Sequence, residues 1–282
     1  MNAAEALEQA KARMPTDLDT SKMYVDANQA KKYAEHRPRY SEEIFQFMVD
    51  YCKETMPALN SCVDVGCGSG QSTVGFSKYF KNVVGVDISP SQIANAPKDI
   101  PNVQFKVSSA EKLPFVPSES VDLWCSGESF NYMPKELTYK EADRVLKPGG
   151  TMAIFGYAVP HAAEKPIQDA ISAMFLKLLP YWPRESLSTF EKFSNVELPY
   201  PGWFRNDDVK QIQRLTLKDY MGLIGSLWSS VAYRKANPEE DLMGDLEKSM
   251  GAALEQVYGS KNDAVFEMIW DSFIIIGRKP FK

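Results

Sequence analysis

The segment VDVGCGSG at residues 63–70 places three glycines at alternate positions, directly after a short run of apolar residues. A stretch compatible with a helix follows from Gln71 to Phe80, and a second apolar run at 83–86 ends in Asp87. This order predicts a β-α-β unit, with glycines where a ligand approaches the backbone and a carboxylate placed for ribose hydroxyls. The sequence therefore predicts a site for a nucleoside-containing cofactor.

The glycine spacing separates two cofactor classes. A dinucleotide fingerprint has the spacing G-x-G-x-x-G, whereas here the glycines are Gly66, Gly68 and Gly70, and Gln71 occupies the third-glycine position. Asp64 would repel a diphosphate and suits a cationic ligand. Because S-adenosyl-L-methionine carries a sulfonium and an ammonium group, the segment favours this cofactor over NAD.

Length and composition limit the class of protein. The chain has 282 residues, 44% of them hydrophobic, which is enough for one large α/β domain with a buried core. The net charge is −5, so we expect no nucleic-acid partner. No stretch approaches the ~18 apolar residues that span a bilayer, and no apolar leader is present. We expect a cytoplasmic protein without a membrane partner, as a monomer or a dimer.

The four cysteines are Cys52, Cys62, Cys67 and Cys125. They lie within expected core elements and lack the paired C-x-x-C spacing of a zinc site. We expect reduced cysteines that mainly pack, and no metal site. Cys67 lies inside the glycine turn and is therefore counted among the cofactor-binding residues.

Strand-like runs alternate with helical or loop segments, which predicts a parallel, doubly wound α/β sheet with flanking helices. The expected strands are 61–65, 83–86, 103–107, 120–125 and 151–157, and the expected helices are 41–56, 135–146, 166–179, 216–229 and 238–257. Lys147-Pro148-Gly149-Gly150 predicts a turn between helix and strand. The β-rich stretches Val265–Trp270 and Ser272–Gly277 predict either a hairpin or two strands that flank a neighbour.

Four motifs occur in register: Asp64–Gly70, Val86-Asp87, SAEKLPF at 109–115 and RVLKPGG at 144–150. Together they resemble the class I S-adenosylmethionine-dependent methyltransferases. The resemblance implies a seven-stranded, Rossmann-like sheet whose last strand is antiparallel. Residues 33–40 and the aromatic-rich insertion resemble the branch that includes trans-aconitate methyltransferases. Many such sequences carry His-Trp after the fourth strand, where this chain has Asn131-Tyr132.

We expect a single methyltransferase domain over residues 1–282 with four parts. Residues 1–40 resemble a lid, 41–158 form the cofactor-binding core, 159–260 form a helical and aromatic substrate cap, and 261–282 supply strands that complete the sheet.

The resemblance and the glycine turn together assign the cofactor contacts. We expect the turn to approach the methionyl carboxylate, Asp64 to hold the ammonium group, and Asp87 to accept both ribose hydroxyls. Ser109 is expected beside the adenine amine, and Ile88 against the adenine face. The complete set is Tyr33, Arg37, Asp64, Gly66, Cys67, Gly68, Gly70, Asp87, Ile88, Ser109, Ala110, Glu111 and Ser126.

The loop after the fourth strand should pass close to the transferable methyl group, because loops at the carboxyl ends of parallel strands line the ligand site. The catalytic candidates are Glu128, Tyr132 and His161. The substrate-binding candidates are Tyr40, Asn131, Tyr132, Trp203, Arg205, Trp228 and Tyr233.

These features predict methyl transfer from S-adenosylmethionine to a small-molecule acceptor. An ionised carboxylate needs only alignment, whereas an amine must first lose a proton. Arg37 or Arg205 would orient a carboxylate, and Glu128, Tyr132 or His161 would become more important for an amine. The family branch and the arginines favour O-methylation of a carboxylate. N-methylation of a small amine, and a catalytically inactive regulatory protein that binds the cofactor, stay open.

Overall fold

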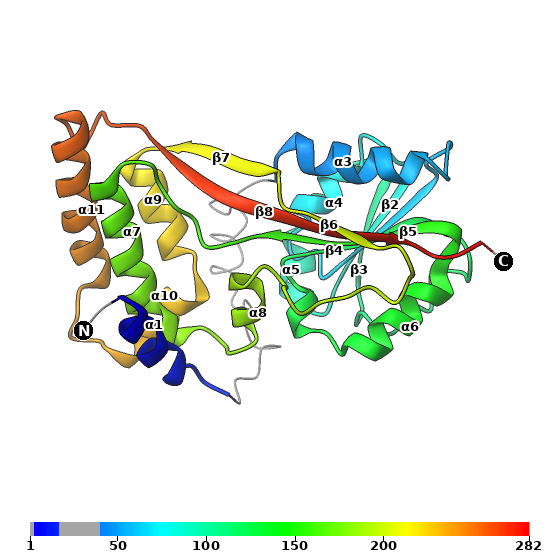
Figure 1. Ribbon diagram of the computed structural model, residues 1–282, viewed down its shortest axis with the longest axis horizontal. Helices are drawn as coiled ribbons and strands as arrows, with labels where there is room; N and C mark the ends of the chain where they lie inside the picture. The colour runs from blue at the N-terminus through cyan, green and yellow to red at the C-terminus, as the bar shows by residue number, and fades with distance from the viewer. Residues whose placement is uncertain (1–2, 17–39, 282) are drawn as a thin grey trace. The chain divides into compact units, whose positions relative to one another are not determined.

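The structure is a computed structural model, and it describes residues 3–16 and 40–281. These residues divide into two compact units (Figure 1), and the expected single domain stays a prediction. We call residues 40–158, 188–211 and 271–281 the sheet unit, and residues 3–16, 159–187 and 212–270 the helical unit. The expected lid residues Tyr33 and Arg37 lie outside the described residues, so their roles stay predictions.

Five parallel strands form the centre of the sheet unit. β8 pairs with β5 in antiparallel orientation, and β6 pairs with β8 in antiparallel orientation. The order is β3-β2-β1-β4-β5-β8-β6, with β7 paired to β8 off this path. This confirms the mostly parallel α/β sheet, with eight strands rather than seven. Their bounds are β1 Ser61–Val65, β2 Asn82–Asp87, β3 Val103–Val107, β4 Val121–Gly127, β5 Leu146–Tyr157, β6 Phe204–Asn206, β7 Lys210–Leu215 and β8 Phe266–Arg278.

The central strands are apolar on both faces because helices cover both sides. One face carries Val63, Trp124 and Ile154 in a cluster that includes residues of α6, Lys135–Val145. The opposite face packs against α3, Glu42–Lys53, and α4, Gln71–Phe76. The short elements α5, Pro90–Ala94, and η2, Phe130–Tyr132, follow β2 and β4. This arrangement is the doubly wound architecture that the alternating pattern predicted.

The Lys147–Gly150 segment is part of β5, so the predicted separate turn was wrong. Val121 pairs with Leu146, and Leu123 pairs with Thr151, so β5 bulges where the KPGG residues lie. The Gly149 N–H donates to the Lys279 carbonyl at 2.9 Å. Pairing with the carboxyl-terminal residues therefore draws this segment into the sheet.

β8 is one continuous strand, so the predicted hairpin around Asp271 was also wrong. Residues 272–278 pair with 151–157 of β5, and the Ala158 N–H donates to the Asp271 carbonyl at 2.9 Å. Asp271 has no neighbouring glycine or proline to favour a turn, and the residues before and after it both belong to the paired strand.

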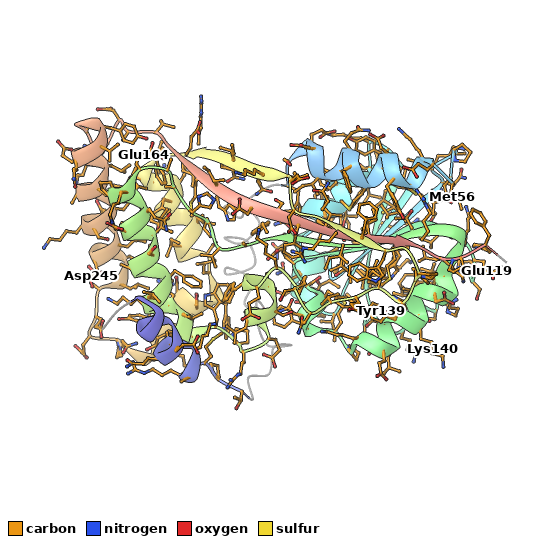
Figure 2. All side chains as sticks on the ribbon, in the orientation of Figure 1. Met56, Glu119, Tyr139, Lys140, Glu164 and Asp245 are labelled. Carbon is orange, nitrogen blue, oxygen red and sulfur yellow. The ribbon has the colours of Figure 1, made fainter. Side chains whose placement is uncertain are left out.

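Residues 188–211 pack on the sheet, although they were expected in the cap. Phe193, Val196 and Leu198 are buried in the same cluster as Trp124. Tyr139 of α6, labelled in Figure 2, donates to the Glu197 carbonyl at 2.8 Å. The apolar side chains of this segment are thus committed to the sheet unit.

The helical unit contains α1 and most of the segment predicted as a cap. Its other elements are α7 Lys165–Leu178, η3 Leu179–Tyr181, α9 Leu217–Gly225, α10 Trp228–Ala236 and α11 Leu242–Tyr258; α1 is Ala3–Ala12, and α8, Ser186–Phe190, lies at the change between units. The expected helix 216–229 is two helices, because Ser226 ends α9 and donates to the Leu223 carbonyl at 2.6 Å. Within the described ranges, every helix is too short or too polar to cross a membrane.

Candidate functional site

The glycine turn joins β1 to α4 through three residues in the left-handed region. Gly66, Gly68 and Gly70 have φ values of +72°, +56° and +93°. Only glycine adopts these conformations without strain. The N–H groups of Gly66 and Cys67 donate to the Val86 carbonyl at 2.7 and 2.9 Å, which ties the turn to β2.

The three glycines differ in the space beside them. A Cβ on Gly66 would lie 2.2 Å from the Ser129 hydroxyl oxygen, and one on Gly70 would lie 2.6 Å from the Phe105 ring. Beside Gly68 the nearest such atom is the Gln71 Oε1, at 4.0 Å. The turn is therefore packed at both ends and open in the middle, where a ligand can approach the backbone.

Asp87 ends β2 next to the open glycine. One of its carboxylate oxygens accepts the Gly68 N–H and the other accepts the Ser89 N–H, both at 2.8 Å. Burial raises the pKa of Asp87, and the two N–H groups oppose this shift. A carboxylate at this position suits a ligand with paired hydroxyls, as expected for ribose.

In the structure Asp64 accepts hydrogen bonds from side chains of the protein, whereas the sequence predicted that it holds the ammonium group of the cofactor. It is fully buried and accepts the hydroxyls of Ser72 and Thr73 at 2.7 and 2.6 Å. The Cys125 thiol donates to its other oxygen at 3.8 Å. Burial raises the pKa of Asp64 to about 6, against these hydrogen bonds. In the structure Asp64 joins β1 to the first turn of α4, and a contact with the cofactor stays a prediction.

Two exposed apolar side chains flank Asp87. Ile88 follows it in the chain, and Val107 is its partner on β3; their exposed fractions are 60% and 52%. Such exposure at adjacent strand ends suits a flat apolar ring. Ile88 was among the residues predicted from the sequence, and Val107 was not. The available signal for Val107 was its position as an apolar residue at the end of a predicted strand.

The loop after β3 is held from α6. The Leu113 N–H donates to Glu141 at 2.6 Å, and Arg144 donates to the Leu113 carbonyl at 3.0 Å. The SAEKLPF and RVLKPGG segments therefore support each other. Ser109, Ala110 and Glu111 lie in this loop, Ala110 is buried, and their adenine contacts stay predictions.

The loop after β4 is attached to the glycine turn. Ser126 is buried, and its hydroxyl lies 3.0 Å from that of Ser129. Ser129 donates to the Val65 carbonyl at 3.3 Å. Because this loop packs on the turn, the strand-end region of β4 borders the expected cofactor position, where Ser126 stays a predicted contact.

Glu128 follows β4 in a strained conformation. Its φ is +56°, in a region that non-glycine residues rarely adopt. Its carboxylate accepts the Tyr157 N–H at 2.6 Å, and its own N–H donates to the Phe155 carbonyl at 3.0 Å. A Cβ on Gly156 would lie 2.1 Å from this carboxylate, so the side chain lies across Gly156. Strain of this kind is common at functional sites.

Other substrate candidates of the sheet unit lie near the same strand ends. The Tyr40 ring centre lies 4.9 Å from that of Phe155 and 5.8 Å from that of Tyr157. Asn131 and Tyr132 belong to η2, and 37% of Tyr132 is exposed. The structure thus gathers Tyr40 and Glu128 around the end of β5.

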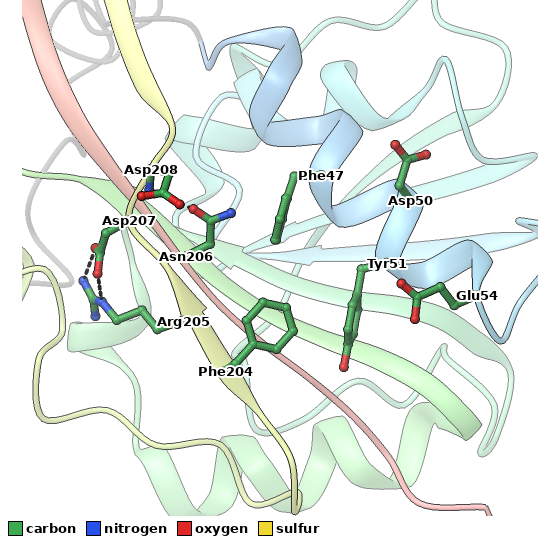
Figure 3. A pocket seen from close by; sticks show the side chains of 9 residues that line it. All are labelled: Phe47, Asp50, Tyr51, Glu54, Phe204, Arg205, Asn206, Asp207 and Asp208. Carbon is green, nitrogen blue, oxygen red and sulfur yellow. Dashed lines mark hydrogen bonds and ion pairs between the residues drawn. The ribbon is translucent and has the colours of Figure 1, made fainter.

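The side chains of Arg205 and Trp203 both contact other residues of the protein. Arg205 forms a two-pronged pair with Asp207 at 2.6 and 2.8 Å and donates to the Lys192 carbonyl at 2.7 Å. It borders a surface groove of about 630 Å³ between α3 and β6 (Figure 3). Trp203 packs beside Gly277, whose partner Met152 lies before the carboxyl end of β5. We therefore do not propose substrate roles for either residue.

Three candidates belong to the helical unit. His161 exchanges backbone hydrogen bonds with Ile269 at 2.9 and 2.8 Å. Tyr233 is buried and donates to Glu240, and its ring lies 5.0 Å from that of Tyr181. Trp228 begins α10. The substrate roles of these three residues stay predictions.

Cys67 is not an activated nucleophile. Burial, with Asp64 and Asp87 nearby, raises the pKa of its thiol well above the usual range. The thiol therefore stays protonated at neutral pH. Among the residues that the structure describes, no three Asp, Glu, His or Cys side chains are grouped to hold a metal ion.

These observations fit S-adenosylmethionine. The open backbone at Gly68, the carboxylate of Asp87 beside it, and the exposed pair Ile88 and Val107 form one continuous edge at the ends of β1, β2 and β3. They match the aminoacyl, ribose and adenine parts of a nucleoside ligand in that order.

Comparisons with known proteins agree with this geometry. Residues 63–154 match the family described as "Methyltransferase domain". A methyltransferase-like protein of Dictyostelium discoideum is 25% identical over 259 residues, which are 89% of this chain and 93% of the relative. The 2-methyl-6-phytyl-1,4-hydroquinone methyltransferase of Synechocystis is 30% identical over 57% of this chain, and the match spans about half of the relative, 54%.

A solved structure from Anaeromyxobacter dehalogenans, described as a type II methyltransferase, shares the fold. Its TM-score is 0.75 at 23% identity, over 87% of this chain and 99% of that one. The domain match over residues 63–154, the fold and the strand-end edge together support a class I methyltransferase. The chain is an S-adenosylmethionine-dependent methyltransferase, and S-adenosyl-L-methionine is its cofactor.

Proposed function

We propose that the chain methylates a small-molecule acceptor whose reacting atom carries a proton, with an amine as the first candidate. The observation that carries this proposal is the position of Glu128, a carboxylate held in a strained conformation at the carboxyl end of β4. S-adenosylmethionine, when bound, supplies an electrophilic methyl group. The contribution of the protein is to orient the acceptor, exclude water and take up the acceptor's proton.

Glu128 is suited to the proton-accepting role. Two hydrogen bonds with β5 fix its position: its carboxylate accepts the Tyr157 N–H, and its own backbone N–H donates to the Phe155 carbonyl. It follows the strand next to β1, on a loop that packs against the glycine turn through Ser129. A carboxylate there also attracts an ammonium group, and the rings of Tyr40 and Tyr157 offer faces that stabilise a cation.

O-methylation of a carboxylate was the first expectation from the sequence, and the structure supports it less. Arg205, the expected anchor, is already neutralised by Asp207. Arg37, the other anchor, lies outside the described residues. An acidic acceptor beside Glu128 would meet a like charge, which is unfavourable. The likeness to trans-aconitate methyltransferases rests on residues 33–40, which lie outside the described residues, and on the aromatic-rich insertion; it stays a proposal.

A transfer assay tests this function. The purified chain would be incubated with S-adenosylmethionine carrying a labelled methyl group and separate panels of small amines, phenols and carboxylic acids. We expect label in amines. Glu128→Gln should lower kcat by about 100-fold or more, the usual contribution of a general base, and leave cofactor affinity within a few-fold. Glu136→Gln, an exposed position on α6, is the matched control.

Each other outcome has a clear meaning. Label found only in carboxylic acids, with no effect of Glu128→Gln, would restore the carboxylate assignment. Cofactor binding in a calorimeter without transfer to any panel would favour the regulatory, catalytically inactive protein. Label in phenols alone would point to acceptors of the kind named for the hydroquinone methyltransferase relative.

A further inference from the structure

A groove of about 630 Å³ lies on the surface of the sheet unit (Figure 3). One side of it is a face of α3 that carries Phe47, Asp50, Tyr51 and Glu54, because residues three, four and seven positions apart share one face of a helix. The other side is formed by residues 204–208, which are β6 and the turn that follows it. The groove therefore joins two segments that are distant in the sequence.

The groove lies away from the cofactor edge. β6 is the last strand in the sheet order, and β4, β5 and β8 separate it from β1. At roughly 4.8 Å per strand, the distance along the sheet from β1 to β6 is about 19 Å. On the helix side, Glu54 contacts Arg278, whose partner on β5 is Thr151, far from the carboxyl end at Tyr157. Methyl transfer is expected at the carboxyl ends, so the groove is a separate site.

Three aromatic rings form the apolar part of the groove. Phe204 is 40% exposed, and its ring centre lies 5.5 Å from that of Tyr51 and 6.3 Å from that of Phe47. The helix α3 places other residues in the core, among them the fully buried Ile44 and Met48. An exposed aromatic cluster beside a groove is typical of a surface that binds another molecule.

The groove carries an excess of negative charge, because four carboxylates and one guanidinium line it. Two of the carboxylates are paired inside the protein. Arg205 lies 2.6 Å from Asp207, and Arg278, which is outside the lining, lies 2.6 Å from Glu54. The other two carboxylates account for the excess charge.

These two carboxylates are Asp50 and Asp208, on opposite sides of the groove. Within the described part of the chain, the Asp208 carboxylate has no hydrogen-bond or ion-pair partner. Asp50 accepts the Gln46 amide at 2.6 Å, and its ion pair with Lys53 is exposed and long, at 3.8 Å. Such a pair contributes little. Figure 3 shows Phe47 between Asp208 and Asp50. An aromatic surface with a carboxylate on each side suits a cation that has an apolar neighbour.

The groove already contains one example of this recognition. The Arg278 guanidinium lies 3.8 Å from the centre of the Tyr51 ring while it pairs with Glu54. A guanidinium or ammonium group is stabilised over an aromatic face, and its aliphatic stem packs on apolar surface. Nucleic acids and anionic membranes carry phosphates that these carboxylates would repel. Charge complementarity therefore favours a basic partner.

We propose that this groove binds an extended segment of a partner protein in which an arginine or lysine lies beside an aromatic or aliphatic side chain. The apolar side chain covers Phe204, and the basic side chain lies between Asp50 and Asp208. Binding there does not depend on which acceptor is methylated, because the groove shares no residue with the strand-end site around Glu128.

The length of the groove favours a peptide segment over a free amine. Phe47 and Glu54 are seven positions apart on α3, a distance of roughly 10 Å at 1.5 Å per residue. Three residues of an extended peptide cover the same distance. A peptide also supplies both parts that the groove matches, a cation and an uncharged apolar side chain, whereas a free polyamine supplies only the cations.

A random heptapeptide library displayed on phage tests the groove. The library would be selected against the full wild-type chain and, in parallel, against Asp208→Lys, which reverses the charge on one side of the groove. Peptides enriched in both selections bind elsewhere and are set aside. We expect the peptides enriched only with wild type to carry arginine or lysine beside an aromatic residue or leucine.

Fluorescence anisotropy with the most enriched peptide locates the contact. Phe204→Ser and, separately, Asp208→Asn should each weaken binding by about 10-fold or more, and added salt should weaken it further in wild type. Ile212→Ser, at a 53% exposed apolar position on β7, and Glu136→Gln, at an exposed position on α6, are the matched controls and should bind as wild type does. Asp208→Asn breaks no contact of the described residues, so it keeps the test usable if Phe204→Ser folds poorly. Methyl transfer should be unchanged in these variants.

Contrary results are distinct. No peptide enriched with wild type over Asp208→Lys, or enrichment of acidic peptides, would overturn the proposal. A peptide that binds Phe204→Ser and Asp208→Asn as tightly as wild type would also overturn it. Spermidine that binds wild type as tightly as the peptide does, and displaces it, would assign the groove to a free polyamine instead. Failure of methyl transfer to amines, with peptide binding intact, would reject the amine proposal and keep the groove.

Discussion

The backbone N–H of Gly68 donates a 2.8 Å hydrogen bond to the carboxylate of Asp87. One residue is the open glycine of the turn after β1, and the other ends β2. This bond joins the two halves of the β-α-β unit at the point where we expect the nucleoside part of the cofactor. The cofactor edge is therefore organised by the protein's own hydrogen bonds.

Asp87→Asn should weaken cofactor binding at least 10-fold and leave the fold intact. A carboxylate accepts two hydroxyls, whereas an amide offers one acceptor atom and a donor that opposes the second hydroxyl. Isothermal titration with S-adenosylmethionine measures the change. Asp99→Asn, at an exposed position before β3, is the control and should bind as wild type does. Equal affinities for the two variants would remove Asp87 from the ribose site.

Gly66→Ala should destabilise the protein far more than Gly202→Ala. Both glycines have nearly the same left-handed φ, +72° and +75°, but a Cβ on Gly202 meets nothing within 4 Å, whereas one on Gly66 would overlap Ser129. Gly202→Ala therefore reports backbone strain alone, about 1–2 kcal/mol. Urea unfolding of both variants gives the difference, which is the cost of the overlap. Similar losses would show that Ser129 can move aside.

Asp64→Asn should flatten part of the pH dependence of stability. The pKa of Asp64 is raised by burial from near 3.8 to about 6, so the folded state binds a proton that the unfolded state releases in this range. Wild-type stability attributable to Asp64 is thus greatest below pH 4 and falls by roughly 2–3 kcal/mol as the pH rises through 6. We would measure the free energy of unfolding in denaturant at pH 4 and at pH 7. Between these two pH values the variant should lose less stability than wild type. An unchanged difference would mean that Asp64 is not protonated at pH 4 in the fold.

Asp122→Ala should cost roughly 3 kcal/mol of stability, because it leaves three donors without their partner. The buried Asp122 carboxylate accepts the N–H groups of Asn60 and Ser61 at 2.6 and 2.8 Å and pairs with Lys147 at 2.5 Å. Asp169→Ala breaks the exposed pair with Lys165 and should change stability by less than about 0.5 kcal/mol. Urea unfolding compares the two variants. A similar small loss in both would show that solvent reaches the Asp122 site.

The glycine turn, the acidic end of the second strand and the central strands were all predictable from local sequence. Their signals are short-range: glycine spacing, an apolar run of strand length, and an acid at its end. Ile88 and Glu128 became candidates because each follows a strand whose carboxyl end is expected to face the ligand, and their contacts stay predictions. The class of cofactor was likewise predicted from the eight residues 63–70.

Other features depended on contacts that the sequence pattern did not show. Arg205 was predicted as a substrate anchor, but in the structure it pairs with Asp207 and donates to the Lys192 carbonyl. The segment 188–211 was predicted as part of the cap, but in the structure its apolar residues pack in the same cluster as Trp124.

The sequence by itself determined the β-α-β unit and its donor site, because a turn of glycines imposes its conformation locally. Only the tertiary structure decided which distant polar side chains lie close together and whether each has a hydrogen-bond partner. Gln211 and Ser272 are 61 positions apart and meet through the pairing of β7 with β8, and nothing in their local sequence reports that neither finds a partner there.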